Sequence, residues 1–190
     1  MYKIEIPKTV YVYMDFSNPL CKWNFIRGVI ESPKIYNKSN QSIQEIGFFL
    51  KSRLESHNYK LKLENDIETI RKIKFPYLYS RLNSLYFFET KQDAKNTAIE
   101  SNGHFIEENL IECILPINSV YQKYDMNWIT YYNEEHNNYS KDWIEQYWKG
   151  NICPTSKYGV PDYECLTTNN LIIKDTSIKQ KYYNLFEKES

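Results

Sequence analysis

The chain has 190 residues, a length that fits one domain of ordinary size better than two very small ones. Hydrophobic residues make up 42% of the chain and charged residues 25%, so it can bury a core, and intrinsic disorder is excluded. The 24 Lys and Arg residues balance the 24 Asp and Glu residues. The chain therefore lacks the overall positive field that non-specific nucleic-acid binding needs.

The first part of the chain predicts one strand and then helices. Residues 9–14 (TVYVYM) are β-branched and aromatic, which predicts a buried strand. Three helical segments are expected after it, at residues 22–30, 42–56 and 64–73. Phe75-Pro76 terminates the last of them, because the residue before a proline is pushed out of the helical region.

The second part of the chain mixes strands and helices. Strands are predicted at residues 84–88, 105–115, 163–166 and 171–174. Helices are predicted at 91–100 behind a Thr90 cap, in two pieces between 118 and 150, of which the second covers 140–150, and at 177–189. Because strands and helices cluster rather than alternate, we expect a single α+β domain over residues 1–190. Its core would be two small, split antiparallel sheets around a cleft, with flanking helices.

Several common site motifs are absent from the sequence. It contains no G-x-G-x-x-G, Walker A, G-x-S-x-G or H-E-x-x-H pattern. Its four cysteines form no C-x-x-C pair, and surface or capping roles are expected for the three histidines, so no metal site is predicted. The N-terminus lacks an apolar signal region, and no run of 18 apolar residues occurs. We therefore expect a cytoplasmic protein with reduced thiols and no membrane association.

Tyrosine is the unusual feature of the composition, with 18 residues in the chain. The simpler explanation is an A/T-rich genome, whose codons favour tyrosine. The alternative is a binding surface lined with tyrosine, because the side chain offers a flat apolar ring with a polar tip.

A polar cluster at residues 80–84 leads directly into the aromatic strand at 84–88. One interpretation is a well-packed corner between a strand and a helix. The other is functional: Arg81 and Ser84 would face a cleft, and Tyr86 would present its ring as a stacking wall.

Glu164 stands within an apolar strand, between Tyr163 and Cys165. A carboxylate in such a strand is costly unless it is paired or faces an open site. The strand could be an edge strand that holds Glu164 in water. Alternatively, Glu164 could be a catalytic carboxylate at the wall of a cleft.

Taken in order, these segments resemble the ADP-ribosyltransferase superfamily, in its poly(ADP-ribose) polymerase-like and bacterial toxin-like branches. Ser84-Leu85-Tyr86-Phe87, followed by a helix with Ala94 and Ala98, is similar to the family's Gly/Ser-x-Tyr-Phe strand and helix. Glu164-Cys165-Leu166 resembles the late strand that the catalytic glutamate opens, and residues 24–28 (NFIRG) resemble the segment that grips the adenosine side. The chain departs from the pattern at the first strand, which no histidine follows.

The resemblance implies a mono-ADP-ribosyltransferase that uses NAD as substrate and needs no metal. Glu164 would be the catalytic residue, and Tyr86 would stack on the nicotinamide. Ser84 and Arg81 would orient NAD, and Tyr13 would take the place of the missing histidine, with Arg81 as a possible substitute. The acceptor would be a macromolecule, a protein before a nucleic acid, with water also open.

Two other classes remain open at this point. The fold could be retained without catalysis, so that the tyrosine-rich surface serves as a protein-binding module or inhibitor; the missing histidine favours this. The chain could instead be an unrelated α+β hydrolase that uses Glu164 together with Asp162 or Glu89, although no spacing of a carboxylate pair supports it.

Overall fold

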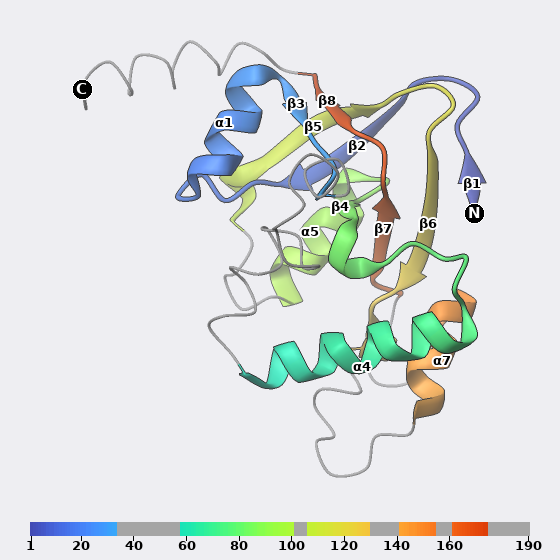
Figure 1. Cartoon of the computed structure of the whole chain (residues 1–190). Helices are drawn as coiled ribbons and strands as arrows, with labels where there is room; N and C mark the ends of the chain where they lie inside the picture. The colour runs from blue at the N-terminus through green and yellow to red at the C-terminus, as the bar shows by residue number, and fades with distance from the viewer. Residues whose placement is uncertain (34–57, 101–105, 130–140, 155–160, 175–190) are drawn as a thin grey trace, which may run out of the picture. The chain divides into compact units, whose positions relative to one another are not determined.

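The computed structural model describes residues 1–33, 58–100, 106–129, 141–154 and 161–174 (Figure 1). The helices predicted at 42–56 and 177–189 lie outside the described residues. The three histidines, His57, His104 and His136, lie outside them as well. The fold is α+β, as predicted, with two antiparallel four-stranded sheets of strand order β1-β6-β7-β4 and β2-β5-β8-β3.

The chain divides into two compact units, which are described separately. The first unit comprises Met1, Ser32–Tyr86 and Tyr121–Thr168. The second unit comprises Tyr2–Glu31, Phe87–Val120 and Asn169–Ser190. The single-domain assignment over residues 1–190 stays a prediction.

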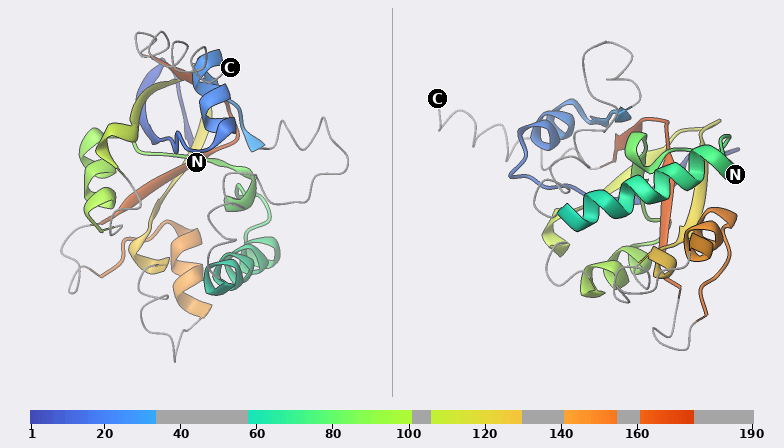
Figure 2. Two further views of the ribbon diagram at one scale, coloured as in Figure 1. Left: turned by 90° about the vertical axis from the view of Figure 1, so that its left-hand side faces the viewer. Right: turned by 60° about the horizontal axis from the view of Figure 1, so that its bottom comes forward.

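The first unit is formed by helices and strands from three parts of the chain. Its elements, two of which reach one residue past its borders, are α4 (Asn58–Lys74), the 3₁₀ turn η1 (Arg81–Asn83), β4 (Leu85–Phe87), β6 (Val120–Asp125), α7 (Lys141–Lys149) and β7 (Tyr163–Thr167). Strand β7 lies between β6 and β4 in the sheet order, and Tyr124 pairs with Glu164 across β6 and β7. Helices α4 and α7 lie side by side (Figure 2).

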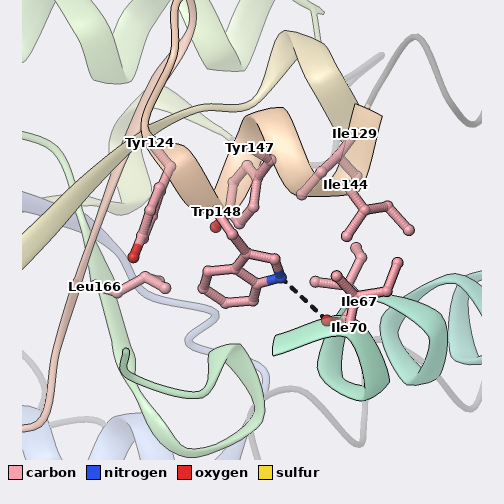
Figure 3. Close-up of a cluster of buried hydrophobic side chains, with 8 residues drawn as sticks. All are labelled: Ile67, Ile70, Tyr124, Ile129, Ile144, Tyr147, Trp148 and Leu166. Carbon is pink, nitrogen blue, oxygen red and sulfur yellow. Dashed lines mark hydrogen bonds between the residues drawn. The ribbon is translucent and has the colours of Figure 1, made fainter. Parts of the chain in front are cut away.

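An apolar cluster joins the two helices of the first unit to the sheet. It contains Ile67 and Ile70 from α4, Ile144, Tyr147 and Trp148 from α7, with Tyr124, Ile129 and Leu166 (Figure 3). The indole nitrogen of Trp148 donates to the carbonyl oxygen of Ile67 at 3.0 Å. Helical spacing explains the contributions, because residues three and four apart share one face of a helix.

Asp125 connects the end of β6 to two other segments of the first unit. Its carboxylate accepts from the backbone N–H groups of Asn127 at 3.0 Å, Cys153 at 2.9 Å and Asp162 at 3.2 Å. These bonds satisfy a buried carboxylate with backbone donors, which offsets much of the cost of removing it from water. Asp125 thereby fixes the residue that directly precedes β7, the strand of Glu164.

The second unit is built around the other sheet. Its elements are β1 (Tyr2–Lys3), β2 (Lys8–Tyr13), α1 (Pro19–Arg27), β3 (Val29–Ile30), α5 (Lys91–Glu100), the 3₁₀ turn η2 (Glu107–Asn109), β5 (Leu110–Leu115) and β8 (Leu171–Ile173). Strands β2 and β5 are antiparallel, with Lys8 opposite Leu115 and Tyr13 opposite Leu110. Buried apolar side chains from this sheet include Val10, Cys113, Leu115 and Leu171.

Helix α1 shows why the segment after Pro19 folds as it does. The side chain of Asn18 accepts from the N–H of Leu20, and Pro19 occupies the first turn, where its missing N–H is not needed. The helix ends at Gly28, whose φ of 75° is in the left-handed region that glycine adopts without strain. Directly after Gly28 the chain enters β3.

Several of the predicted elements are confirmed, and three differ. Most elements lie where the sequence predicts them. The bounds agree to within one residue for α5, α7, β2, β4, β7 and β8, whereas α4 begins at Asn58, before the predicted start at residue 64. The first helical piece expected after residue 118 is wrong over residues 120–125, which form β6 and pair with β7. Residues 127–129 are helical, and residues 130–140 lie outside the described residues. The strand expected from residue 105 begins only at Leu110, after η2, and the helical stretch at 22–30 begins at Pro19 and ends at Arg27.

Candidate functional site

The loop between α4 and β4 presents Arg81 in a constrained position. The side chain of Ser80 accepts from the N–H of Leu82 at 3.2 Å and so caps η1. The hydroxyl of Ser84 donates to the carbonyl oxygen of Ser80 at 2.7 Å, which closes the turn from its other end. Arg81 is the first residue of this short turn, so its backbone is held on both sides.

An ion pair on α4, in which Glu68 is buried and Arg71 is half-buried, also holds this loop in place. Arg71 donates to Glu68 through Nε at 2.9 Å and through Nη2 at 2.7 Å, and its Nη1 donates to the carbonyl oxygen of Leu78 at 2.8 Å. The hydroxyl of Ser80 donates to Glu68 at 2.9 Å. Helix α4 therefore anchors the loop that carries Arg81 through side chains as well as through the chain itself.

Arg81 stands at the centre of a buried charged cluster. It is 5% exposed, and its partners are Glu64 from α4, Tyr147 from α7 and Glu164 from β7. Its Nε and Nη2 donate to Glu64 at 3.0 and 2.9 Å, and its Nη1 donates to the Tyr147 hydroxyl at 2.9 Å. Its Nη1 also forms an ion pair with Glu164. One cation thus serves two carboxylates, which leaves a formal charge of minus one.

The two oxygens of the Glu164 carboxylate differ in their surroundings. Oε1 accepts from Arg81 and from the hydroxyl of Tyr147, the latter at 2.5 Å. Oε2 accepts no hydrogen bond from any of the described residues. The side chain is held at one oxygen and keeps the acceptor capacity of the other.

Two tyrosine rings flank the guanidinium of Arg81. Its central carbon lies 5.2 Å from the ring centroid of Tyr86 and 5.4 Å from that of Tyr147, distances typical of cation–π contacts. The hydroxyl of Tyr86 donates to the carbonyl oxygen of Arg81 at 2.8 Å. Aromatic faces and carboxylates together make these surroundings favourable to a positive charge.

The surroundings shift two pKa values in this cluster. Burial alone would lower the pKa of Arg81, but the nearby Glu64 carboxylate, with Tyr147 and Tyr86, raises it well above its usual value. Burial raises the pKa of the Tyr147 hydroxyl well above its usual value, although the Arg81 cation acts in the opposite direction. At neutral pH Arg81 is therefore a cation and Tyr147 is a neutral hydrogen-bond donor.

Three of the predicted site residues come together. Glu164 and Tyr86 both contact the guanidinium of Arg81, and their strands are neighbours in one sheet. The interpretation of Glu164 as a residue of an edge strand exposed to water is wrong, since β7 is flanked on both sides and Glu164 is 5% exposed. Ser84 is buried, and its hydroxyl bonds within the loop.

Tyr13 belongs to the second unit. Its hydroxyl donates to the carbonyl oxygen of Ala94 at 3.0 Å, and its ring meets that of Phe88 edge to face. Glu89 and Asp162, the two alternative partners of Glu164 in a hydrolase, are in different units. Glu89 forms an ion pair with Lys8 in the second unit, and Asp162 directly precedes β7 in the first.

Sequence reasoning missed Glu64 and Tyr147. Glu64 is three residues before Ile67 on α4, and Tyr147 is three residues after Ile144 on α7. Both positions fall on the apolar face of their helix, where a polar group needs a partner. A search for polar side chains on otherwise apolar helix faces would have found both.

A comparison with protein-family models finds no match to this chain, and neither does a comparison with curated proteins. Among the described residues, no group of His, Cys, Asp and Glu side chains could hold a metal ion. No helix in the described part of the chain is long and apolar enough to cross a membrane.

Proposed function

We propose that the protein is an NAD-consuming mono-ADP-ribosyltransferase, with its reaction centre at the Arg81 cluster. One observation carries the proposal. Tyr86 and Glu164, 78 positions apart (164 − 86), belong to the two segments with the family resemblance, lie on the adjacent strands β4 and β7, and contact the same guanidinium.

The chemistry of NAD cleavage matches the residue types of the cluster. Breaking the bond between nicotinamide and ribose develops positive charge on the ribose, as in glycoside hydrolysis. Glu164 would stabilise this charge, and its Oε2 is free of hydrogen bonds from the described residues and could accept one from a ribose hydroxyl. Tyr86 would stack on the cationic nicotinamide ring.

The remaining roles follow the family resemblance. Arg81 and Ser84 would orient NAD, with Tyr13 in the place of the missing histidine. The ADP-ribose would pass to a macromolecular acceptor, a protein before a nucleic acid, in the cytoplasm. Arg81 is the only one of these three whose contact with Glu164 supports its role directly.

The proposal is tested by nicotinamide release from NAD and by a thermal-shift titration with NAD. Glu164→Gln keeps the shape of the side chain and removes its charge, so we expect turnover to fall by on the order of 10²–10³ or more, with NAD binding largely kept. Tyr86→Ala should instead weaken NAD binding, because the stacking ring is lost.

A matched control for Glu164→Gln is Glu112→Gln, which changes a carboxylate of an exposed ion pair in the second unit. It should leave turnover unchanged. Full activity in Glu164→Gln would refute the mechanism. Absence of NAD binding and of nicotinamide release in the wild-type protein would refute the function itself.

One specific observation favours a second candidate, a protein-binding module or inhibitor without catalysis. Glu164 is buried and its charge is matched by Arg81, as in an ion pair that serves the fold alone. Under this alternative, Glu164→Gln would alter the thermal stability, and the wild-type protein would not release nicotinamide.

A further inference from the structure

Glu64 binds the guanidinium of Arg81 along one edge. Its Oε2 accepts from Nε at 3.0 Å and its Oε1 accepts from Nη2 at 2.9 Å, so the contact is bidentate. A bidentate pair fixes the plane of a guanidinium as well as its position. Both side chains are buried, so water competes little for these bonds. Glu64 thereby sets the orientation in which Arg81 meets its second carboxylate.

Arg81 meets that second carboxylate, Glu164, through a single nitrogen. Nη1 donates to Oε1 of Glu164, whereas Nε and Nη2 donate to Glu64. An arginine with one carboxylate partner tends to bind both of its oxygens. Because Glu64 occupies the edge formed by Nε and Nη2, Arg81 leaves Oε2 of Glu164 without a donor from the described residues.

We infer that Glu64 is a positioning residue for the proposed reaction. It holds Arg81 by one edge and so keeps Oε2 of Glu164 available to the ribose hydroxyl of NAD. This inference rests on the proposed function, because it assigns Glu64 an effect on turnover. Glu64 itself acts through Arg81 and is not expected to touch NAD.

The charges of the cluster make a change at Glu64 less disruptive than a change at Arg81. With both carboxylates ionised, the cluster has one positive and two negative charges. Glu64→Gln leaves a neutral pair of Arg81 and Glu164, whereas removal of Arg81 leaves two carboxylates facing each other. Glu64→Asp provides a second variant that keeps the carboxylate on a shorter side chain.

Glu68 offers a matched control one turn further along α4. Glu64 is 8% exposed and Glu68 is 7% exposed, and each binds an arginine through both oxygens. Glu68 pairs with Arg71 rather than Arg81, and a glutamine there can still accept from the Ser80 hydroxyl. If Glu64 only stabilised the fold, Glu64→Gln and Glu68→Gln would lower kcat and Tm to the same extent.

The kinetic test measures kcat and KM for NAD in three variants. We expect Glu64→Gln to lower kcat by about 10- to 100-fold with KM within about threefold, because Oε2 is then captured by Arg81. Glu64→Asp should recover part of this loss. Glu68→Gln should lower kcat by less than about threefold despite a similar fall in Tm, because Glu68 holds the loop of Arg81 and does not touch its guanidinium. Equal kcat in Glu64→Gln and wild type, or an equal loss in Glu68→Gln, would overturn the inference.

A crystal structure of Glu64→Gln tests the inference without activity. We expect Arg81 to bind both oxygens of Glu164 in this variant. An Oε2 that still lacks an Arg81 donor would overturn the positioning role even if kcat fell. A wild-type protein that does not turn over NAD would refute the proposed function, and the crystal structure would then still decide whether Glu64 controls the contact between Arg81 and Glu164.

Discussion

The two units differ in whether their described charged side chains are buried. In the described part of the first unit, six charged side chains are buried: Glu64, Glu68, Arg81, Asp125, Asp162 and Glu164. In the described part of the second unit, the buried polar side chains are neutral, those of Asn24 and Ser119. The ion pairs of the second unit, such as Arg27 with Glu31 and Lys174 with Glu112, are partly or largely exposed to solvent.

This difference favours the first unit as the part of the chain that holds a functional site. Removing charges from water is costly, and a buried ion pair often stabilises a protein no more than apolar side chains of the same volume would. Solvent-exposed ion pairs lose little hydration when they form, and they add little to the free energy of unfolding. The first unit therefore keeps an arrangement that stability alone does not require, and perturbed groups of this kind gather at functional sites.

The largest effect on stability is expected from removing Arg81. Arg81→Gln leaves the two carboxylates of Glu64 and Glu164 buried without their cation, which should lower the free energy of unfolding by about 3–5 kcal/mol. Arg27→Gln removes an arginine from an exposed pair in the second unit and should cost less than about 1 kcal/mol. Urea denaturation measures both. Equal losses of unfolding free energy in Arg81→Gln and Arg27→Gln would contradict the difference between buried charges in the first unit and exposed ones in the second.

A pH-dependent effect is expected in the second unit. Burial, with a smaller contribution from Glu112, raises the pKa of the Cys113 thiol from 9.0 to about 12. Between about pH 9 and 12 the unfolded chain loses this proton while the folded chain keeps it, so stability falls as pH rises. The expected loss approaches about 1.4 kcal/mol for each pH unit in this range.

The Cys113 prediction is checked by comparing wild type with Cys113→Ala in urea at pH 7.5 and pH 10.5. Other alkaline titrations act on both proteins and cancel in the difference. Between the two pH values, the free energy of unfolding of the wild type should fall by about 2 kcal/mol more than that of Cys113→Ala. A difference in stability that does not change with pH would contradict the prediction.

Within the Arg81 cluster, a smaller effect on stability than that of Arg81→Gln is expected at a single hydroxyl group. Tyr147→Phe removes the donor to Glu164 and the acceptor for Arg81, and should cost about 1–2 kcal/mol. Turnover of NAD should fall as well, because Glu164 loses one of its two restraints. Tyr124→Phe is the matched control, since its hydroxyl bonds to Gln122 in the same aromatic cluster. It should lower stability and leave turnover unchanged.

The sequence predicted most elements of the fold through local rules. The Thr90 cap marks the start of α5, and Pro76 marks the end of α4. Both act on the backbone within a few residues. Strand β6 escaped prediction because Lys123 and Asp125, residue types that are depleted in strands, interrupt a segment in which Tyr121 and Tyr124 favour a strand. Pairing with β7, about 40 residues later, decides in favour of the strand.

The candidate site was predictable only in part, for a related reason. Tyr86 and Glu164 lie in segments with a recognisable pattern, so both could be named from the sequence. The pairing of Arg81 with Glu64 and Glu164 depends on contacts 17 and 83 residues apart. Nothing local to Glu64 distinguishes it from a glutamate on a solvent-exposed helix face, apart from its place on a face shared with Ile67.

The bond between Trp148 and the carbonyl oxygen of Ile67 gives the protein an internal optical probe. Trp148 is 2% exposed and its indole is hydrogen-bonded, whereas Trp23 in the second unit is 56% exposed. A shielded indole emits at shorter wavelength and resists collisional quenchers, and an exposed one does neither. Fluorescence that acrylamide quenches therefore comes from Trp23 and from the half-buried Trp128 and Trp143 rather than from Trp148. The protected, blue-shifted fraction reports whether α4 and α7, the two helices that hold Glu64 and Tyr147, are still in contact.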